Sequence, residues 1–372
     1  MRIRSSRAFA VLVCLAVAAC GRGSATPPPP PPPDVVKPTP RPVPSPTEAR
    51  VQLGQKLFAN LCALCHGPDG RGYVADNAPS LVSESFLASA SDAFLRTGIV
   101  EGRPGTAMGA YGRARGGPLS DGDVDAVIAF LRAGKPEPMP AAATATAGDA
   151  TRGKATYTST CKECHGDPAA RGKAPYLANP VFLASASDAF LRHAIVNGRA
   201  DTEMKPFGAT LDAQAIDDVI AYVRTWAPEP AAPVSSQPPP VAAGKVVLNP
   251  DGKAPNFTLK EDRFVAAADV KAALDQKRRL IIVDARTPAD WQRGHIPGAI
   301  SAPYYDLALL DVVPDDGTWV LAYCACPHHA SGIVVDELRK RGFEHTAVID
   351  EGINFWHNQG YPMEGADVDA GH

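Results

Sequence analysis

The chain has 372 residues, a formal net charge of -3 and a pI near 6.3. At ~100–200 residues per domain, this length predicts a multidomain protein in which each domain has its own core. The charge provides no positive field for a phosphate backbone, so we expect no nucleic-acid partner.

The first 20 residues have the pattern of an export signal. A basic start is followed by an apolar run over 8–19 and then by Cys20 and Gly21. The run is about half the ~20 residues that cross a bilayer, so it does not predict a retained membrane helix. Val17-Ala-Ala-Cys20 resembles the lipobox of bacterial lipoproteins, which implies that Cys20 is acylated and anchors the protein to a membrane. The alternative is an ordinary signal peptide cut elsewhere, and both readings predict an exported protein on the periplasmic side of the cell envelope.

Two segments have the composition of linkers. The first linker covers residues 21–47, and twelve of the twenty residues 27–46 are proline. Such a sequence cannot form a core and favours an extended polyproline II spacer. The second, Pro/Ala-rich linker covers 228–250.

An internal repeat lies between the linkers. Residues 86–96 recur letter for letter as 182–192. Helical periodicity closes each copy, with apolar residues at i, i+3, i+4 and i+7 from Val124 and a similar series from Ile216. Ser120 is placed to cap the closing helix of the first copy. These patterns predict two homologous all-α domains, over 48–135 and 148–227.

Each repeat begins with a Cys-x-x-Cys-His motif. The residues are Cys62, Cys65 and His66 in the first copy, and Cys161, Cys164 and His165 in the second. On a turn of helix, the two sulfurs can form thioethers with the vinyl groups of a haem while the imidazole ligates its iron. Paired disulfides or zinc sites are the alternatives. Two motifs in a repeated helical domain favour two covalently bound haem c groups.

Each repeat also supplies a methionine as a candidate sixth iron ligand. Met108 and Met204 both follow a Gly-Arg pair and lie 96 residues apart. The region resembles tandem class I cytochrome c domains, which implies that these methionines are distal ligands to iron. The alternative is a core methionine with His or water on the iron. His193 is the nearby competitor, but Thr97 stands at that place in the first repeat.

The C-terminal part has a different pattern. Short apolar runs at 280–284 and 318–323 are typical of buried parallel strands, and helical stretches are expected near 269–277 and 331–341. This is an α/β pattern.

Several motifs of this part resemble the rhodanese family over 257–364. They are Asp284-Ala-Arg286, Gly294-His-Ile-Pro-Gly298, Tyr323-Cys324 at the end of a strand and Glu351-Gly-Ile-Asn-Phe-Trp356. The resemblance implies a central parallel sheet and a persulfide on Cys324, held in a loop of backbone amides. Such amides lower a thiol pKa and favour the attacking thiolate. Asp284 and Arg286 are expected to pair and to hold this side of the sheet.

The loop departs from the family at its last position. It reads Cys324-Ala-Cys326-Pro-His328-His329, so His329 stands where the family has an arginine. Much of the permanent positive charge expected at this position is therefore lost, because imidazole is only partly protonated at neutral pH. Cys326 is either a relay that passes or resolves sulfur or an incidental small residue. The domain itself is either catalytic or a docking fold without chemistry.

Two functional hypotheses follow from the sequence. In the first, two haems carry electrons to or from redox partner proteins while the C-terminal domain binds or transfers sulfane sulfur from a donor to an acceptor. In the second, the chain is a plain dihaem electron shuttle whose last domain docks a partner or senses oxidants.

Overall fold

The computed structural model describes residues 45–75, 77–135, 138, 147–227, 246–325 and 328–366. The predicted signal with Cys20, nearly all of the first linker, most of the second and Cys326 lie outside these residues. Within the described ranges, no helix combines the length and the apolar character that crossing a membrane requires.

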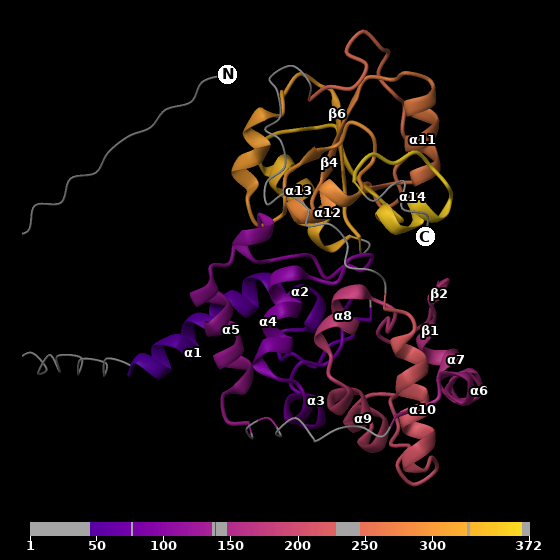
Figure 1. Cartoon of the computed structure of the whole chain (residues 1–372). Coiled ribbons are helices and arrows are strands. Elements are labelled where there is room, and N and C mark those ends of the chain that lie inside the picture. Colours follow the sequence, from indigo (N-terminus) through magenta and orange to yellow (C-terminus); the bar gives the residue numbers. More distant parts are fainter. Residues whose placement is uncertain are drawn as a thin grey trace, which may run out of the picture. The chain divides into compact units, whose positions relative to one another are not determined.

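The first repeat is helical (Figure 1). Its elements are α1 (Pro46–Leu57), the π-helix η1 (Phe58–Cys62), α2 (Ala63–His66), α3 (Glu84–Ser89), α4 (Asp92–Glu101), the 3-10 helix η2 (Arg113–Arg115) and α5 (Asp121–Arg132). The predicted cap is confirmed, because Ser120 forms a capping box with Asp123 at the start of α5. Ser45 and Glu48 form the same motif on α1.

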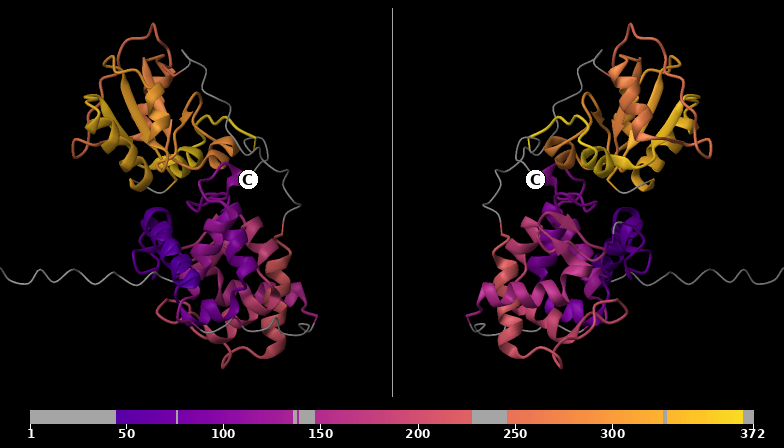
Figure 2. Two further views of the ribbon diagram at one scale, coloured as in Figure 1. Left: turned by 90° about the vertical axis from the view of Figure 1, so that its left-hand side faces the viewer. Right: turned by 90° about the vertical axis from the view of Figure 1, so that its right-hand side faces the viewer.

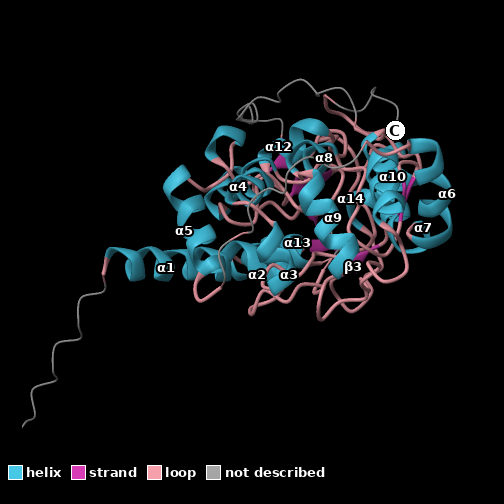
Figure 3. Ribbon diagram, turned by 60° about the horizontal axis from the view of Figure 1, so that its bottom comes forward, coloured by secondary structure: helices cyan, strands magenta, loops and turns pink. Residues whose placement is uncertain are grey.

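The second repeat follows the same order. Its elements are α6 (Ala150–Thr160), α7 (Lys162–His165), β1 (Gly166–Asp167), β2 (Ala170–Arg171), α8 (Pro180–Ser185), α9 (Asp188–Asn197) and α10 (Ala213–Arg224). The antiparallel β1–β2 ribbon was not expected in an all-α domain. It forms because Gly166 adopts a positive φ of 69° and the Asp167 side chain accepts hydrogen bonds from the next turn. Helices still dominate this region, shown in cyan in Figure 3.

Close helix crossing explains one glycine in each repeat. α1 packs on α5 and α6 packs on α10. A Cβ on Gly54 would lie 1.9 Å from the carbonyl oxygen of Ala126, and one on Gly153 would lie 1.9 Å from that of Asp218. Both crossings therefore require a residue without a side chain.

The two repeats belong to one structural unit and contact each other reciprocally. α3 of the first repeat contacts α9 of the second, and α4 contacts α8. Since α8 and α9 are the equivalents of α3 and α4, each contact mirrors the other. Four phenylalanines meet there, with Phe94 and Phe190 at 4.7 Å between ring centroids. The other two rings belong to Phe86 and Phe182, each packed edge-on to Phe190.

The C-terminal domain is an α/β fold around a five-stranded parallel sheet of order β3-β7-β6-β4-β5 (Figure 2). Its elements are β3 (Phe264–Val265), α11 (Ala267–Asp275), β4 (Leu280–Asp284), α12 (Pro288–Arg293), β5 (Ile300–Ser301), the 3-10 helix η3 (Leu307–Val312), β6 (Trp319–Tyr323), α13 (His329–Lys340), β7 (Thr346–Ile349) and α14 (Gly352–Asn358). All five residues of β4 are buried, as expected for a strand covered on both faces. The predicted class of this domain is confirmed.

Candidate functional site

Each Cys-x-x-Cys-His motif positions its histidine in the same way. His66 is 6% exposed at the end of α2, and its Nδ1 lies 2.9 Å from the carbonyl oxygen of Pro79. In the second repeat, His165 Nδ1 lies 3.0 Å from the carbonyl oxygen of Pro175. A carbonyl only accepts, so Nδ1 carries the proton and Nε2 is the nitrogen left for a metal. Burial lowers the pKa of both imidazoles, which favours the neutral, ligating form.

None of the four cysteines of these motifs forms a disulfide among the described residues. Cys62 is the last residue of the π-helix η1, and Cys65 lies on α2, which follows directly. Burial raises the pKa of Cys62 to about 12 and that of Cys161 to about 11. A thioether carries no charge and suits such an apolar setting, whereas a thiolate does not.

Met108 and Met204 close two loops of identical construction. The backbone N–H of Arg103 donates to the carbonyl oxygen of Met108 at 2.7 Å, and Arg199 donates to that of Met204 at 2.9 Å. Within the first loop, the Thr106 hydroxyl donates to the Arg103 carbonyl oxygen and accepts from the N–H of Met108. Thr202 makes the same two bonds in the second loop.

These candidate ligands line one continuous cavity of about 1190 Å³. The four cysteines, both histidines and both methionines of the repeats are all among its lining residues. A cavity for one small ligand usually measures ~300–1,000 Å³. The volume of the cavity and the candidate ligands that line it therefore fit two haems, each with a histidine and a methionine available to the iron.

The competing ligand His193 does not line this cavity within the described residues. Its Nδ1 is buried without a hydrogen-bond partner there. Burial is the main cause that lowers the pKa of His193, followed by the nearby positive charge of Arg199. The cavity therefore favours methionine over His193 as the sixth ligand.

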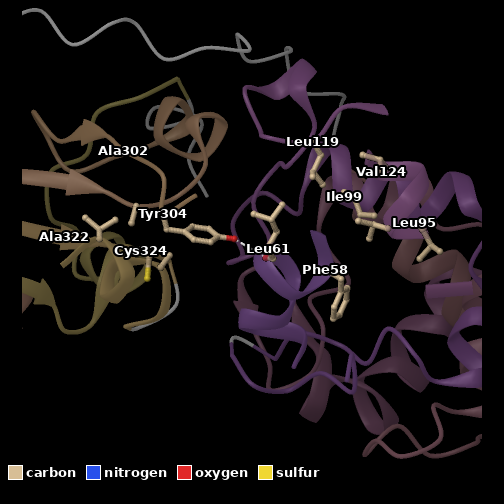
Figure 4. Packing of buried hydrophobic residues seen from close by; sticks show 14 of the residues in the cluster. Phe58, Leu61, Leu95, Ile99, Leu119, Val124, Ala302, Tyr304, Ala322 and Cys324 are labelled. Carbon is tan, nitrogen blue, oxygen red and sulfur yellow. Dashed lines mark hydrogen bonds between the residues drawn. The ribbon is translucent and has the colours of Figure 1, made fainter. Parts of the chain in front are cut away.

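Cys324 directly follows β6, at the carboxyl end of the sheet (Figure 4). It is 2% exposed, and its Sγ lies 3.3 Å from Ser331 Oγ on α13. The N–H of Ile353 donates to the Cys324 carbonyl oxygen at 3.0 Å. A Cβ on Gly352 would lie 2.6 Å from that same oxygen, so the start of α14 closes tightly behind the cysteine.

The two loop histidines occupy different places. His328 has a φ of 78°, its ring lies 4.0 Å from that of Phe264, and its Nε2 is 2.6 Å from Asp350 Oδ1. The pKa of Asp350 is lowered: burial alone would raise it, but bonds from His328 and Lys260 outweigh that effect. His329 begins α13. Cys326 is outside the described residues.

The predicted pair of Asp284 and Arg286 is confirmed. Arg286 Nη2 donates to Asp284 Oδ2 at 2.6 Å and to the Gly294 carbonyl oxygen at the same distance. The Tyr323 hydroxyl donates to the same carboxylate at 2.7 Å. Burial alone would lower the pKa of Arg286, but the Asp284 carboxylate holds it above its ordinary value. The Asp284 carboxylate thus ties the end of β4 to Tyr323 on β6.

Sequence reasoning missed several residues of these sites. Thr106 and Thr202 recur at the same offset as the methionines, so the shared pattern Gly-Arg-x-x-Thr-x-Met was a visible signal. Ser331 and Asp350 had no such signal, because only the folded loop brings them to Cys324 and His328.

Three family descriptions match separate parts of the chain. Residues 51–135 match Cytochrome c, residues 148–223 match Cytochrome C oxidase, cbb3-type, subunit III, and residues 266–359 match Rhodanese-like domain.

Curated relatives resemble parts of the chain. A cbb3-type cytochrome c oxidase subunit CcoP of Azospirillum sp. (strain B510) is 30% identical over 190 residues, which cover 46% of this chain and 60% of the relative. A FixP subunit of Bradyrhizobium sp. (strain ORS 278) is 29% identical over 182 residues, covering 46% of this chain and 59% of the relative. The chain thus spans about three fifths of the length of these relatives.

Solved structures are similar to part of the chain. A rhodanese-like domain from Anabaena sp. is 26% identical, covers 30% of this chain and 85% of its own, and gives a TM-score of 0.28. A thiosulfate sulfurtransferase from Pseudomonas aeruginosa is 31% identical, covers 28% of this chain and 20% of its own, and gives 0.26.

Cytochrome c domains imply covalently bound haem c, and both Cys-x-x-Cys-His motifs lie within the residues that the two cytochrome descriptions match. The chain is therefore a multidomain protein that carries cytochrome c domains followed by a C-terminal rhodanese-like domain.

Proposed function

We propose that this protein is an exported, lipid-anchored dihaem c-type cytochrome that transfers electrons, and that its rhodanese-like domain binds or transfers sulfane sulfur on Cys324. The observation that carries the electron-transfer part is the cavity of about 1190 Å³ lined by two complete Cys/Cys/His/Met sets.

In this proposal, Cys62, Cys65, His66 and Met108 hold one haem, and a second set of four residues holds the other. These residues are Cys161, Cys164, His165 and Met204. A haem supplies a one-electron couple at its iron when bound. Because a histidine and a methionine of each set would both bind the iron, the site would favour outer-sphere electron transfer to redox partner proteins over ligand chemistry.

The sulfur step uses Cys324. Its thiolate attacks the outer sulfur of a donor such as thiosulfate, a new S–S bond forms on Cys324, and the donor's S–S bond breaks to release sulfite. No net electron is exchanged in this transfer. Removing the bound sulfur reductively takes two electrons and one proton, and it yields hydrosulfide and the original thiolate. Two haems, each carrying one electron, match that demand.

The test uses the full holoprotein and Cys324→Ser. Reduced and oxidised samples receive thiosulfate or a low-molecular-weight persulfide without oxygen, while visible spectra follow the haems and mass spectrometry follows the gain of one sulfur atom. A change in haem redox state that requires Cys324 supports the proposal. Sulfur loading that leaves the haems unchanged contradicts the coupling between the domains.

A second candidate is an electron shuttle whose rhodanese-like domain only docks a partner. The 2% exposure of Cys324 favours it, because a nucleophile must meet its substrate. This candidate predicts no sulfur loading in the experiment above and identical haem kinetics in the wild type and in Cys324→Ser.

A further inference from the structure

Arg103 and Arg199 are buried arginines that line the cavity, and no carboxylate forms an ion pair with either of them among the described residues. Each follows a turn glycine that recurs in both repeats, in the pairs Gly102-Arg103 and Gly198-Arg199. Here the glycine is needed for its backbone, because Gly102 has a φ of 68° and Gly198 one of 65°.

The guanidinium of each arginine lies on an aromatic ring of its own repeat. Arg103 Cζ is 5.3 Å from the ring centroid of Phe94, and Arg199 Cζ is 4.9 Å from that of Phe190. Arg199 Nη1 also donates to the carbonyl oxygen of Ser85 at 2.9 Å. Its Nη2 is buried and has no hydrogen-bond partner in the described residues.

Neighbouring arginines of the repeats show what is unusual here. Arg96 pairs with Asp125 and its counterpart Arg192 pairs with Asp217. Arg132 pairs with Asp92, again through a carboxylate of its own repeat. A cation removed from water requires a counter-charge or strong hydrogen bonds, and aromatic faces supply only part of this.

Burial also changes the acid–base behaviour of the guanidinium groups of Arg103 and Arg199. Burial lowers the pKa of Arg103 to about 10 and that of Arg199 to about 10. Both side chains therefore remain charged at neutral pH and would gain from an anion inside the cavity. A haem brings two propionate carboxylates, which guanidinium groups bind with charge-assisted hydrogen bonds.

We propose that Arg103 and Arg199 bind the haem propionates, one arginine in each repeat, and that their charges raise the reduction potentials of the haems. The inference rests on the proposed dihaem function. A positive charge near the iron disfavours the ferric state, and neutralising a propionate removes negative charge that would favour it.

Arg199→Gln and Arg103→Gln in the full holoprotein test the assignment, with Arg192→Gln as the matched control. Arg192 is an arginine of the same repeat, but it already pairs with Asp217 and does not line the cavity. We expect each cavity variant to shift the reduction equilibrium of one haem at least tenfold towards the ferric form. For a one-electron couple, this lowers the reduction potential by about 59 mV or more. The control should leave the potentials unchanged.

Two further readouts keep the test decisive if a Gln variant takes up haem poorly. Arg199→Lys retains the charge and should restore most of the potential. Resonance Raman spectra should show altered propionate bending modes in the Gln variants alone. Two haems per chain with potentials and propionate modes equal to wild type in both Gln variants would overturn the assignment, while leaving the dihaem function standing.

Discussion

Methionine sulfur is the ligand whose role can be tested one residue at a time. Met204→His replaces a thioether with an imidazole, which is a stronger donor to ferric iron. We expect the potential of the second haem to fall by on the order of 100 mV, within the ~0.8 V that axial ligands span. Spectroelectrochemical titration of the holoprotein measures this, and the first haem serves as the internal reference. A Met204→His protein with both potentials unchanged would exclude Met204 as a ligand.

Residue identities in the haem sites were predictable only where chemistry and spacing coincide. Cys62, Cys65 and His66 form a contiguous motif, and Met108 follows a repeated Gly-Arg pair. The role of Arg103 could not be read from spacing, since arginines at the surface and in the cavity look alike in sequence. Its position on the ring of Phe94, in the lining of the cavity, exists only after folding.

At the scale of helices, the crossing of α1 and α5 depends on Gly54. Gly54→Ala would place a Cβ 1.9 Å from the Ala126 carbonyl oxygen, so the helices must separate. We expect a loss of ~1–3 kcal/mol, the usual cost of overpacking. Gly122→Ala on α5 is the control, because its nearest atom would be 3.9 Å away and alanine favours helix. Thermal denaturation followed at the Soret band should separate the two, and equal stability of both variants would refute the crossing.

A pH-dependent ion pair between Arg152 and Asp218 joins α6 to α10. Bonds from Arg152, with a smaller contribution from the Asp149 N–H, lower the pKa of Asp218 to about 2. The unfolded value is ~3.9, so this stabilisation is fully present above about pH 4 and is lost as pH falls towards 2. We expect Asp218→Asn to be less stable than wild type at pH 7. Denaturation curves between pH 7 and 2 should show the difference shrinking at the acidic end, and a constant difference would contradict this account.

Element types were predictable from periodicity, and the exceptions have local causes. The apolar run at 280–284 forms β4 with no change of bounds, because its burial on both faces leaves no helical alternative. The β1–β2 ribbon was missed, since two-residue strands have no periodicity and this one depends on Gly166 and Asp167. The π-helix η1 before Cys65 was also missed, because a single π turn of five residues is too short to show a period of its own in the sequence.

At the scale of the whole protein, the proposed attachment to a membrane depends on Cys20. We expect Cys20→Ala in a bacterial host to move the holoprotein from the membrane fraction to the soluble periplasmic fraction, with haem content unchanged. Cell fractionation followed by haem staining measures this. Mass spectrometry of the wild-type N-terminal peptide should show a diacyl or triacyl cysteine, and an unmodified N-terminus beginning elsewhere would contradict the lipid anchor.

The reciprocal contacts of α3 with α9 and of α4 with α8 have the form of an isologous interface, in which patch i meets patch j on both sides. The tandem repeats therefore have the geometry of a homodimer whose two subunits have been joined into one polypeptide. Fusion makes the pairing independent of concentration. It also frees each half to change alone, as the exchange of Thr97 for His193 at equivalent positions illustrates. Two identical subunits cannot change one site without changing the other, whereas the two repeats of one chain can differ from each other.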